Sequence, residues 1–253
     1  MLSVHLCSRG RNTLIGMAVV VAALVTGCAF GSEPSEAPAV PSDNVIVSPI
    51  PTATLTSESA GPPADAASDS ALAAVDELVV QGRGPKTGYD RDLFGTSWID
   101  TDGDGCDTRN QLLRQQLTEL TIGNDCRVLA GILVDPFTGR SIRFEYGGTS
   151  EVDVDHIVSL SDAWQKGASR WTTEQRIVFA NDPLNLQPTD AAANRQKGDG
   201  DTATWLPPNT SYRCTYVVRQ VAVKTKYEIS ITPAERDAMV RVLSECPDQT
   251  LPR

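Results

Sequence analysis

Histidine is scarce in this 253-residue chain, which contains only two. His5 lies in a segment that we expect to be removed, which leaves His156 as the one imidazole of the mature protein. The cysteines form no CxxC pair, which argues against a structural zinc site. Basic residues are also few, 22 against 32 acidic ones, for a net charge of −10. A protein of that sign does not attract nucleic acid over its whole surface.

The first 27 residues resemble a bacterial lipoprotein signal. Arg9 and Arg11 precede an apolar run at residues 14–25 that is too short for a spanning helix. Cys28 follows that run directly after small residues, so we expect it to carry a lipid. The alternative is an ordinary secretory signal with a chance cysteine. Both interpretations predict export, and lipidation would hold the protein at the outer face of the bacterial cell membrane.

Residues 28–70 are expected to form a disordered linker behind the lipidated cysteine. From residue 29 on they are rich in Pro, Ala, Ser and Thr, with six acidic residues and no basic one, and cannot bury enough surface to offset ordering entropy. Without those six acids and the two leader arginines, residues 71–253 keep 26 acidic and 20 basic residues, a net charge of about −6. A polyanionic substrate would therefore need a local basic patch or a bridging cation.

Four cysteines remain after the linker, an even number in an oxidising compartment: Cys106, Cys126, Cys214 and Cys246. Helices at residues 212–226 and from Pro233 onward, the second capped by Thr232, would form an antiparallel pair that brings Cys214 and Cys246 together. Cys106 and Cys126 similarly bracket a predicted helix. We therefore expect two disulfides, 106–126 and 214–246.

The periodicity predicts a mixed α+β domain without internal repeats. Further helices are expected at residues 71–80, 108–120, 162–168 and 173–179, and through residues 194–197 behind Thr189 as a cap. Strands are expected at residues 127–133 and 141–146, joined by a hairpin-like turn, and at residues 184–187.

The most informative string is Asp-Val-Asp-His-Ile-Val at residues 153–158. Its β-branched residues predict a strand end, where Asp155 and His156 would present a metal ligand and a general base together. Asn185 lies on the next predicted strand, and Asn194 lies on the helix that follows. The string therefore begins an order of strand, strand and helix in which each element carries a polar side chain.

That order, with Asn-Arg-Gln-Lys-Gly at residues 194–198, resembles the HNH nucleases and their ββα-metal core. The wider pattern is similar to exported actinobacterial proteins with an HNH-type domain of the DUF1524 (GmrSD C-terminal) kind, and it covers about residues 89–246. Its motifs are Gly-Cys-Asp-Thr-Arg at 105–109, Asp-Pro at 135–136, Ser-Asp-Ala-Trp at 161–164, Phe-Ala-Asn-Asp-Pro at 179–183, Asn-Leu at 185–186 and Trp-Leu-Pro-Pro at 205–208. Ser159 departs from the family, where proline commonly follows the His-Ile-Val run. The resemblance implies a ββα-metal (HNH) core embedded in a disulfide-stapled, mostly helical domain at residues 71–253.

The resemblance also implies the role of each polar residue. Asp155 and Asn194 would hold a divalent cation, Mg²⁺ or Mn²⁺, and Mg²⁺ prefers such hard oxygen ligands. His156 would act as the general base, since an imidazole of ordinary pKa, about 6.5, can be neutral at working pH. Asn185 would tie the loop between the two strands and orient the base, because an amide can bridge backbone donors and acceptors.

Three basic residues are candidates for substrate binding. Arg195 and Lys197 are candidates for phosphate contacts, with a solvated helix face as the alternative. Arg109 belongs to the family pattern and could reach the same site. These side chains would supply the local positive charge that the domain lacks overall.

A second possible ion site lies at residues 100–105, Asp-Thr-Asp-Gly-Asp-Gly. The spacing imitates the start of an EF-hand loop and makes Asp100, Asp102 and Asp104 candidate Ca²⁺ ligands. Position twelve of such a loop is Gln111 in place of glutamate. The favoured interpretation is an Asp-Gly turn anchored by Cys106.

Taken together, the sequence predicts a surface-anchored, metal-dependent HNH-type endonuclease with DNA as its substrate. One alternative is a non-catalytic extracellular binding lipoprotein on the same fold, which the acidic charge favours. Another keeps the chemistry but acts on RNA or a cell-envelope polymer. Membrane contact is expected only through the lipid anchor, and the sequence indicates no protein partner.

Overall fold

The structure, a computed structural model, describes residues 70–149 and 151–252. The expected signal peptide, the lipid on Cys28 and the linker up to residue 69 lie outside the described residues. In the described part, no helix is long and apolar enough to cross a membrane. The helices are α1 (Ala71–Glu77), α2 (Thr108–Gln116), α3 (Leu160–Gln165), α4 (Thr173–Ala180), α5 (Ala191–Lys197), α6 (Arg213–Lys226) and α7 (Pro233–Leu243). The strands are β1 (Leu117–Ile122), β2 (Val128–Val134), β3 (Ser141–Glu145), β4 (Val152–His156) and β5 (Leu186–Asp190).

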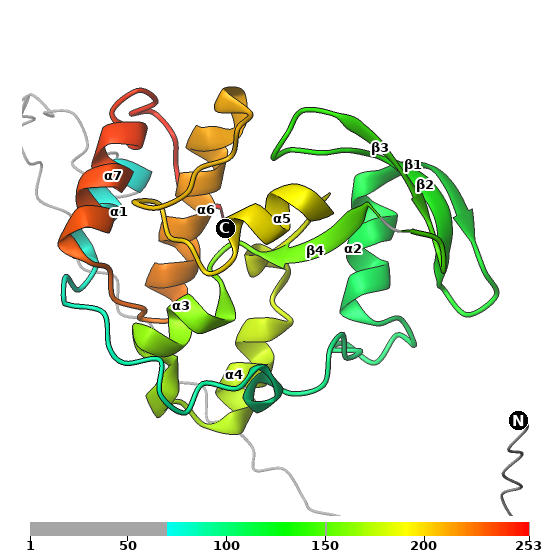
Figure 1. The fold of residues 1–253 in the computed structure, drawn as a ribbon, viewed down its shortest axis with the longest axis horizontal. Helices are drawn as coiled ribbons and strands as arrows, with labels where there is room; N and C mark the ends of the chain where they lie inside the picture. The colour runs from blue at the N-terminus through cyan, green and yellow to red at the C-terminus, as the bar shows by residue number, and fades with distance from the viewer. Residues whose placement is uncertain (1–69, 150, 253) are drawn as a thin grey trace, which may run out of the picture. The chain divides into compact units, whose positions relative to one another are not determined.

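Two small antiparallel sheets hold these strands (Figure 1). One has the order β1-β2-β3, and the other pairs β4 with β5. Helix α5 follows β5 directly and contacts both strands of the second sheet, so β4, β5 and α5 form a β-β-α unit. The predicted mixed α/β architecture is therefore confirmed, and the strands expected at residues 127–133 and 141–146 are present as β2 and β3.

The helix predicted at residues 108–120 is shorter than expected. It ends at Gln116, and the chain continues as β1, where Leu117 pairs with Leu133 and Ile122 with Val128 of β2. The prediction was wrong here because helix propensity is a weak preference that sheet pairing and burial override.

The start of α5 also differs from expectation. Asp190 is its N-cap, and the Asp190 Oδ1 atom accepts a hydrogen bond of 2.8 Å from the Ala193 amide. Thr189, the expected cap, is buried in β5, where its hydroxyl donates to Asp135 Oδ1 at 2.7 Å. Aspartate and threonine are both good caps, so the sequence alone does not distinguish two adjacent candidates.

The strand expected at residues 184–187 begins at Leu186 instead. The preceding turn, η4 (Pro183–Asn185), is a 3₁₀ helix whose Leu184 amide donates to the Asp182 side chain at 3.0 Å. An aspartate followed by proline is a strong local signal for such a turn. Asn185 therefore lies at the end of a rigid turn and not within a strand.

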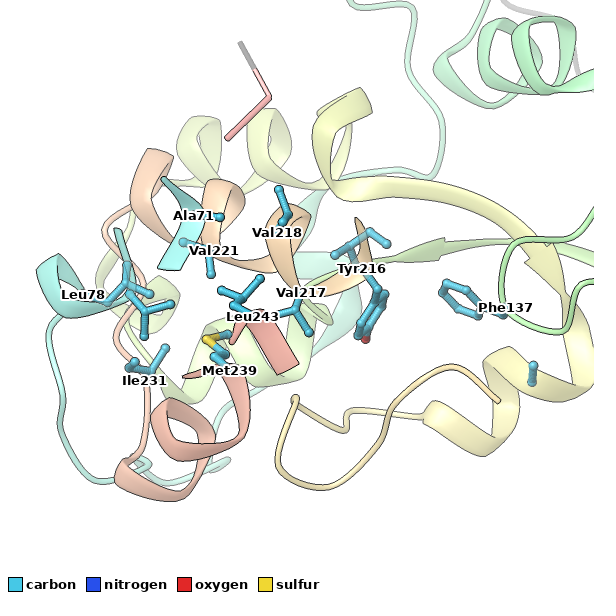
Figure 2. Packing of buried hydrophobic residues seen from close by; sticks show 13 residues of the cluster. Ala71, Leu78, Phe137, Tyr216, Val217, Val218, Val221, Ile231, Met239 and Leu243 are labelled. Carbon is cyan, nitrogen blue, oxygen red and sulfur yellow. The ribbon is translucent and has the colours of Figure 1, made fainter. Parts of the chain in front are cut away.

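Helices α1, α6 and α7 enclose the largest group of buried apolar residues (Figure 2). Val217 and Val221, one turn apart on α6, are fully buried there with Met239 of α7. Phe137, from the turn between β2 and β3, packs edge-on against Tyr216 with ring centroids 5.6 Å apart. This contact connects the helical part to the sheet that carries the turn.

A buried ionic cluster lies beside this core. Its members are Arg83, Asp162, Lys166, Asp201, Lys224 and Glu235. Lys166 Nζ lies 2.6 Å from Glu235 Oε2 and 2.7 Å from Asp162 Oδ1, while Lys224 Nζ lies 2.9 Å from Glu235 Oε1. The three cations of the cluster equal its three carboxylates in number, so each buried charge has a partner of opposite sign.

Both predicted disulfides are confirmed. Cys106 is bonded to Cys126 and Cys214 to Cys246. The first bond connects the segment before α2 to the segment before β2. The second connects the start of α6 to the segment after α7, as expected for antiparallel helices.

Removing the second disulfide is expected to lower the free energy of unfolding by about 2–4 kcal/mol, because the bond restricts the unfolded chain. The double variant Cys214→Ser, Cys246→Ser, which leaves neither cysteine of this pair as a free thiol, opens a cross-link between residues 32 positions apart. Guanidinium unfolding of this variant and of the wild type would measure the difference. An unchanged midpoint and slope would contradict the prediction.

Candidate active site

The Asp-His string forms the end of β4, and α5 packs along that strand (Figure 1). Asp153 and Asp155 are two residues apart and so lie on one face of β4. Asn194 and Lys197, about one turn apart on α5, meet them: Asn194 Nδ2 donates to Asp153 Oδ2 at 3.2 Å, and Lys197 Nζ donates to Asp155 Oδ1 at 3.1 Å. The structure thus brings Asp155, His156 and Asn194 into one β-β-α unit.

His156 is buried and held on two sides. Its Nε2 lies 2.9 Å from the carbonyl oxygen of Ala180, and its ring stacks on Trp98 with centroids 6.2 Å apart. Because a carbonyl only accepts, Nε2 must carry the hydrogen, and Nδ1 is left with a lone pair. Burial lowers the pKa of His156 to about 3, since an imidazolium would lose its hydration there. The imidazole is therefore neutral at physiological pH.

Asp155 is also buried, and its two carboxylate oxygens differ. Oδ1 accepts from Lys197, whereas Oδ2 has no hydrogen-bond partner among the described residues. Burial raises the pKa of the Asp155 carboxyl, and the nearby Lys197 ammonium opposes that rise. A buried carboxylate oxygen without a partner is costly unless another cation binds it.

Lys197 does not lie where a phosphate contact requires. Its side chain is fully buried, and Nζ donates to Asp155 Oδ1, to the His156 carbonyl at 2.8 Å and to the Ser159 hydroxyl at 2.8 Å. All three ammonium hydrogens are thereby used inside the protein. Ser159 accepts one of them and donates to the Gly198 carbonyl at 2.9 Å.

Asn185 bridges the loop after β4. Its Oδ1 accepts from the Val158 amide at 2.8 Å, its Nδ2 donates to the Val158 carbonyl at 3.3 Å, and its own carbonyl accepts from the Ile157 amide at 2.7 Å. The side chain is fully buried. The loop that follows His156 is therefore fixed by the turn that precedes β5.

Arg219 on α6 was not identified from the sequence, although it holds the other side of that turn. Its guanidinium donates to the carbonyls of Pro183, Leu184 and Leu186 at 3.2, 2.8 and 2.9 Å. Gln220, its neighbour, donates to the Ile157 carbonyl at 3.1 Å. The available signal was a pair of long polar residues within an otherwise buried helix face.

A cavity of about 460 Å³ opens beside this unit. Asp155, His156 and Asn194 line it together with Val154 of β4 and residues from three other segments: Lys86, Tyr89, Arg91, Ser159, Leu160, Ser161, Gly198 and Asp199. A smaller space of about 20 Å³, enough for one water molecule, is lined by His156, Trp98 and Arg91 among others. Lys86 and Arg91 were missed from the sequence because nothing in their Gly-rich surroundings indicated a site.

The other two predicted substrate residues do not line this cavity. Arg195 is exposed on α5, beside Asn194. Arg109 is half-buried on α2, with its guanidinium 5.9 Å from the Phe144 ring centroid. Burial lowers the pKa of Arg109, and Asp153 opposes that shift. Arg109 therefore lies near Asp153 of the β-β-α unit and outside the cavity.

The predicted calcium ligands do converge. Carboxylate oxygens of Asp100, Asp102 and Asp104 lie within 4.8 Å of one another at the surface. Asp100 already accepts from the amides of Gly103 and Gly105 at 2.8 Å each, an Asp-Gly turn of the kind favoured above. Calcium binding at this turn stays a prediction.

Comparisons with known proteins show the family of the chain. Residues 108–242 match the family described as GmrSD restriction endonucleases, C-terminal domain. An uncharacterized secreted protein of Arthroderma benhamiae is 38% identical over 188 residues, which is 73% of this chain and 89% of that protein. No solved structure matches the chain.

Proposed function

Since the chain belongs to the family of GmrSD restriction endonuclease C-terminal domains, we propose that it is an exported, metal-dependent endonuclease of the HNH type that hydrolyses DNA. The observation that carries the proposal is the meeting of Asp155, His156 and Asn194 at one cavity on a β-β-α unit. Export follows from the predicted leader and agrees with the relative described as secreted. A lipid on Cys28 would hold the enzyme at the outer face of the membrane.

The cavity residues fit a divalent cation. Asp155 Oδ2 is a buried oxygen without a partner, and Asn194 uses its amide nitrogen toward Asp153, so its amide oxygen remains as a ligand atom. Carboxylate and amide oxygens are the ligands that Mg²⁺ and Mn²⁺ prefer. Asp155 and Asn194 would hold the ion, which when bound would stabilise negative charge on the phosphate and the leaving oxygen.

The protein's own residues would activate the water. His156 accepts a proton from it at Nδ1, because Nε2 is committed to the Ala180 carbonyl. Trp98 and Ala180 fix the plane of the ring, and Asn185 fixes the loop that follows it. Lys197 holds Asp155 and the His156 carbonyl in place, so we assign it a positioning role in this mechanism in place of phosphate binding.

The test is nicking of supercoiled plasmid by the full chain with disulfides intact, in Mg²⁺, in Mn²⁺ and in EDTA. Metal-dependent nicking supports the proposal, and a panel with RNA and envelope polymers establishes which phosphodiester is preferred. Folded protein that binds DNA without cleaving any of these would indicate a binding module on a nuclease fold.

Asp155→Asn is expected to raise the Mg²⁺ concentration for half-maximal nicking by at least about ten-fold, because a neutral amide binds a hard cation weakly. Asparagine keeps an oxygen for Lys197, so the fold should survive. Asp237→Asn, an exposed carboxylate on α7, serves as the matched control. An unchanged Mg²⁺ requirement in Asp155→Asn would contradict the assignment of the ligand.

A further inference from the structure

The residues that line the cavity of about 460 Å³ include two cations, Lys86 and Arg91. We call these two residues and Tyr89, which lies between them, the cationic wall. The wall precedes residue 108, where the match to the family begins. It comes from the segment between α1 and α2, which runs past α3 and α4 through the short helix η2 (Arg91–Phe94) (Figure 1).

The backbone that carries the wall is anchored. The Gly84 amide donates to the Gln165 carbonyl at 2.8 Å, and a Cβ at this position would lie 2.9 Å from that same oxygen, so only glycine fits. Arg83 is paired with Asp162 and Asp201 of the ionic cluster at 2.8 and 2.9 Å. The cations are therefore presented by a fixed segment, which reduces the entropy cost of binding a ligand.

Arg91 is the cation that lacks a counter-ion. Its side chain is exposed and makes no hydrogen bond or ion pair with any residue that the structure describes, although it borders both cavities beside His156. Lys86 by contrast is paired with Asp199 at 2.9 Å, and both side chains are about half exposed. The wall thus holds one free cation and one that a neighbouring carboxylate neutralises.

We infer that Arg91, with Lys86 as a second contact, binds the backbone phosphates of a DNA strand entering this cavity. A guanidinium can donate two parallel hydrogen bonds to a phosphate, which a point charge cannot. Because the domain is acidic overall, such a contact would attract the DNA phosphates at the cavity without requiring a basic surface elsewhere on the protein. The inference rests on the proposed function and names the residues that hold its substrate.

Removing a positive charge and removing a negative charge at the cavity should have opposite effects on DNA affinity. Arg91→Gln is expected to weaken DNA binding about ten-fold at low salt and to reduce the slope of log Kd against log salt by about 0.9, the contribution of one duplex phosphate contact. Asp199→Asn removes the carboxylate that neutralises Lys86 and is expected to tighten binding and steepen the slope.

The measurement is fluorescence anisotropy of a short fluorescein-labelled DNA duplex, and of its single strand, over a range of salt concentrations. Every variant is made in the full chain with His156→Gln, so that cleavage does not interfere. Arg241→Gln is the matched control, since Arg241 is an exposed arginine on α7 that lines neither cavity. Arg91→Lys should keep the salt slope but lose part of the affinity, because an ammonium cannot make the two-pronged contact.

The inference is overturned if Arg91→Gln binds DNA as Arg241→Gln does, or if Asp199→Asn weakens binding. The results distinguish a failure of this inference from a failure of the proposed function. If the wild type nicks DNA and Arg91→Gln does not change DNA binding, the proposed nuclease activity stands and the cationic wall does not bind the phosphates. Binding that depends on Arg91 without nicking in any metal supports the wall and rejects the nuclease.

Discussion

Replacing His156 by glutamine is expected to lower the rate of plasmid nicking by about 10²- to 10⁴-fold, the usual contribution of a general base. Glutamine keeps an N–H group for the Ala180 carbonyl but cannot accept a proton from water. The loss should appear in the turnover rate rather than in DNA affinity, because the change removes the base and leaves Arg91 in place.

Two comparisons make this result specific. Melting temperatures of His156→Gln and the wild type should be similar, since the buried hydrogen bond is preserved. His156→Ala should lose as much activity, but at some cost in stability because it leaves a space beside Trp98. Nicking at the wild-type rate by either variant would show that another group activates the water.

The second large effect concerns stability. Glu235→Ala is expected to lower the free energy of unfolding by about 3–5 kcal/mol, because it leaves Lys166 and Lys224 buried with unbalanced charge. Both lysine side chains are almost completely buried, so their ammonium groups cannot regain bulk hydration. Chemical denaturation by guanidinium, with the slope checked for two-state behaviour, measures this loss.

The chain offers a matched control for that measurement. Asp76 and Arg236 form an ion pair between α1 and α7, with side chains 62% and 40% exposed. Asp76→Ala should therefore cost less than about 1 kcal/mol. Equal losses for Asp76→Ala and Glu235→Ala would mean that the buried cluster contributes no more than a surface pair.

The parts of the fold that the sequence predicted correctly are those with strong local signals. Thr232 and Pro233 begin α7 with a capping box, and the cysteines pair as the helix positions required. β1 was missed because its pairing with β2, and not its own composition, makes it a strand. Local patterns of this kind cannot report which partner a segment meets.

The site shows the same difference between residues that carry a local sequence signal and residues that only the fold brings together. The string around His156 identified Asp155 and His156, two residues that line the cavity and whose roles rest on the tests above. Lys197 could not be placed, because residue type does not reveal whether an ammonium faces water or three internal acceptors. Lys86, Arg91 and Arg219 were missed since each reaches the site from a segment far away in the sequence. Only the folded arrangement defines such neighbours.

Each disulfide joins cysteines that follow one another along the described chain, 106 with 126 and then 214 with 246. Of the three pairings that four cysteines allow, this is the one that an oxidising enzyme forms if it joins thiols in the order in which they leave the translocation channel. The first bond can close before Cys214 has emerged. In the exported protein proposed above, oxidative folding would therefore need no rearrangement of wrongly paired cysteines, a step that is otherwise slow.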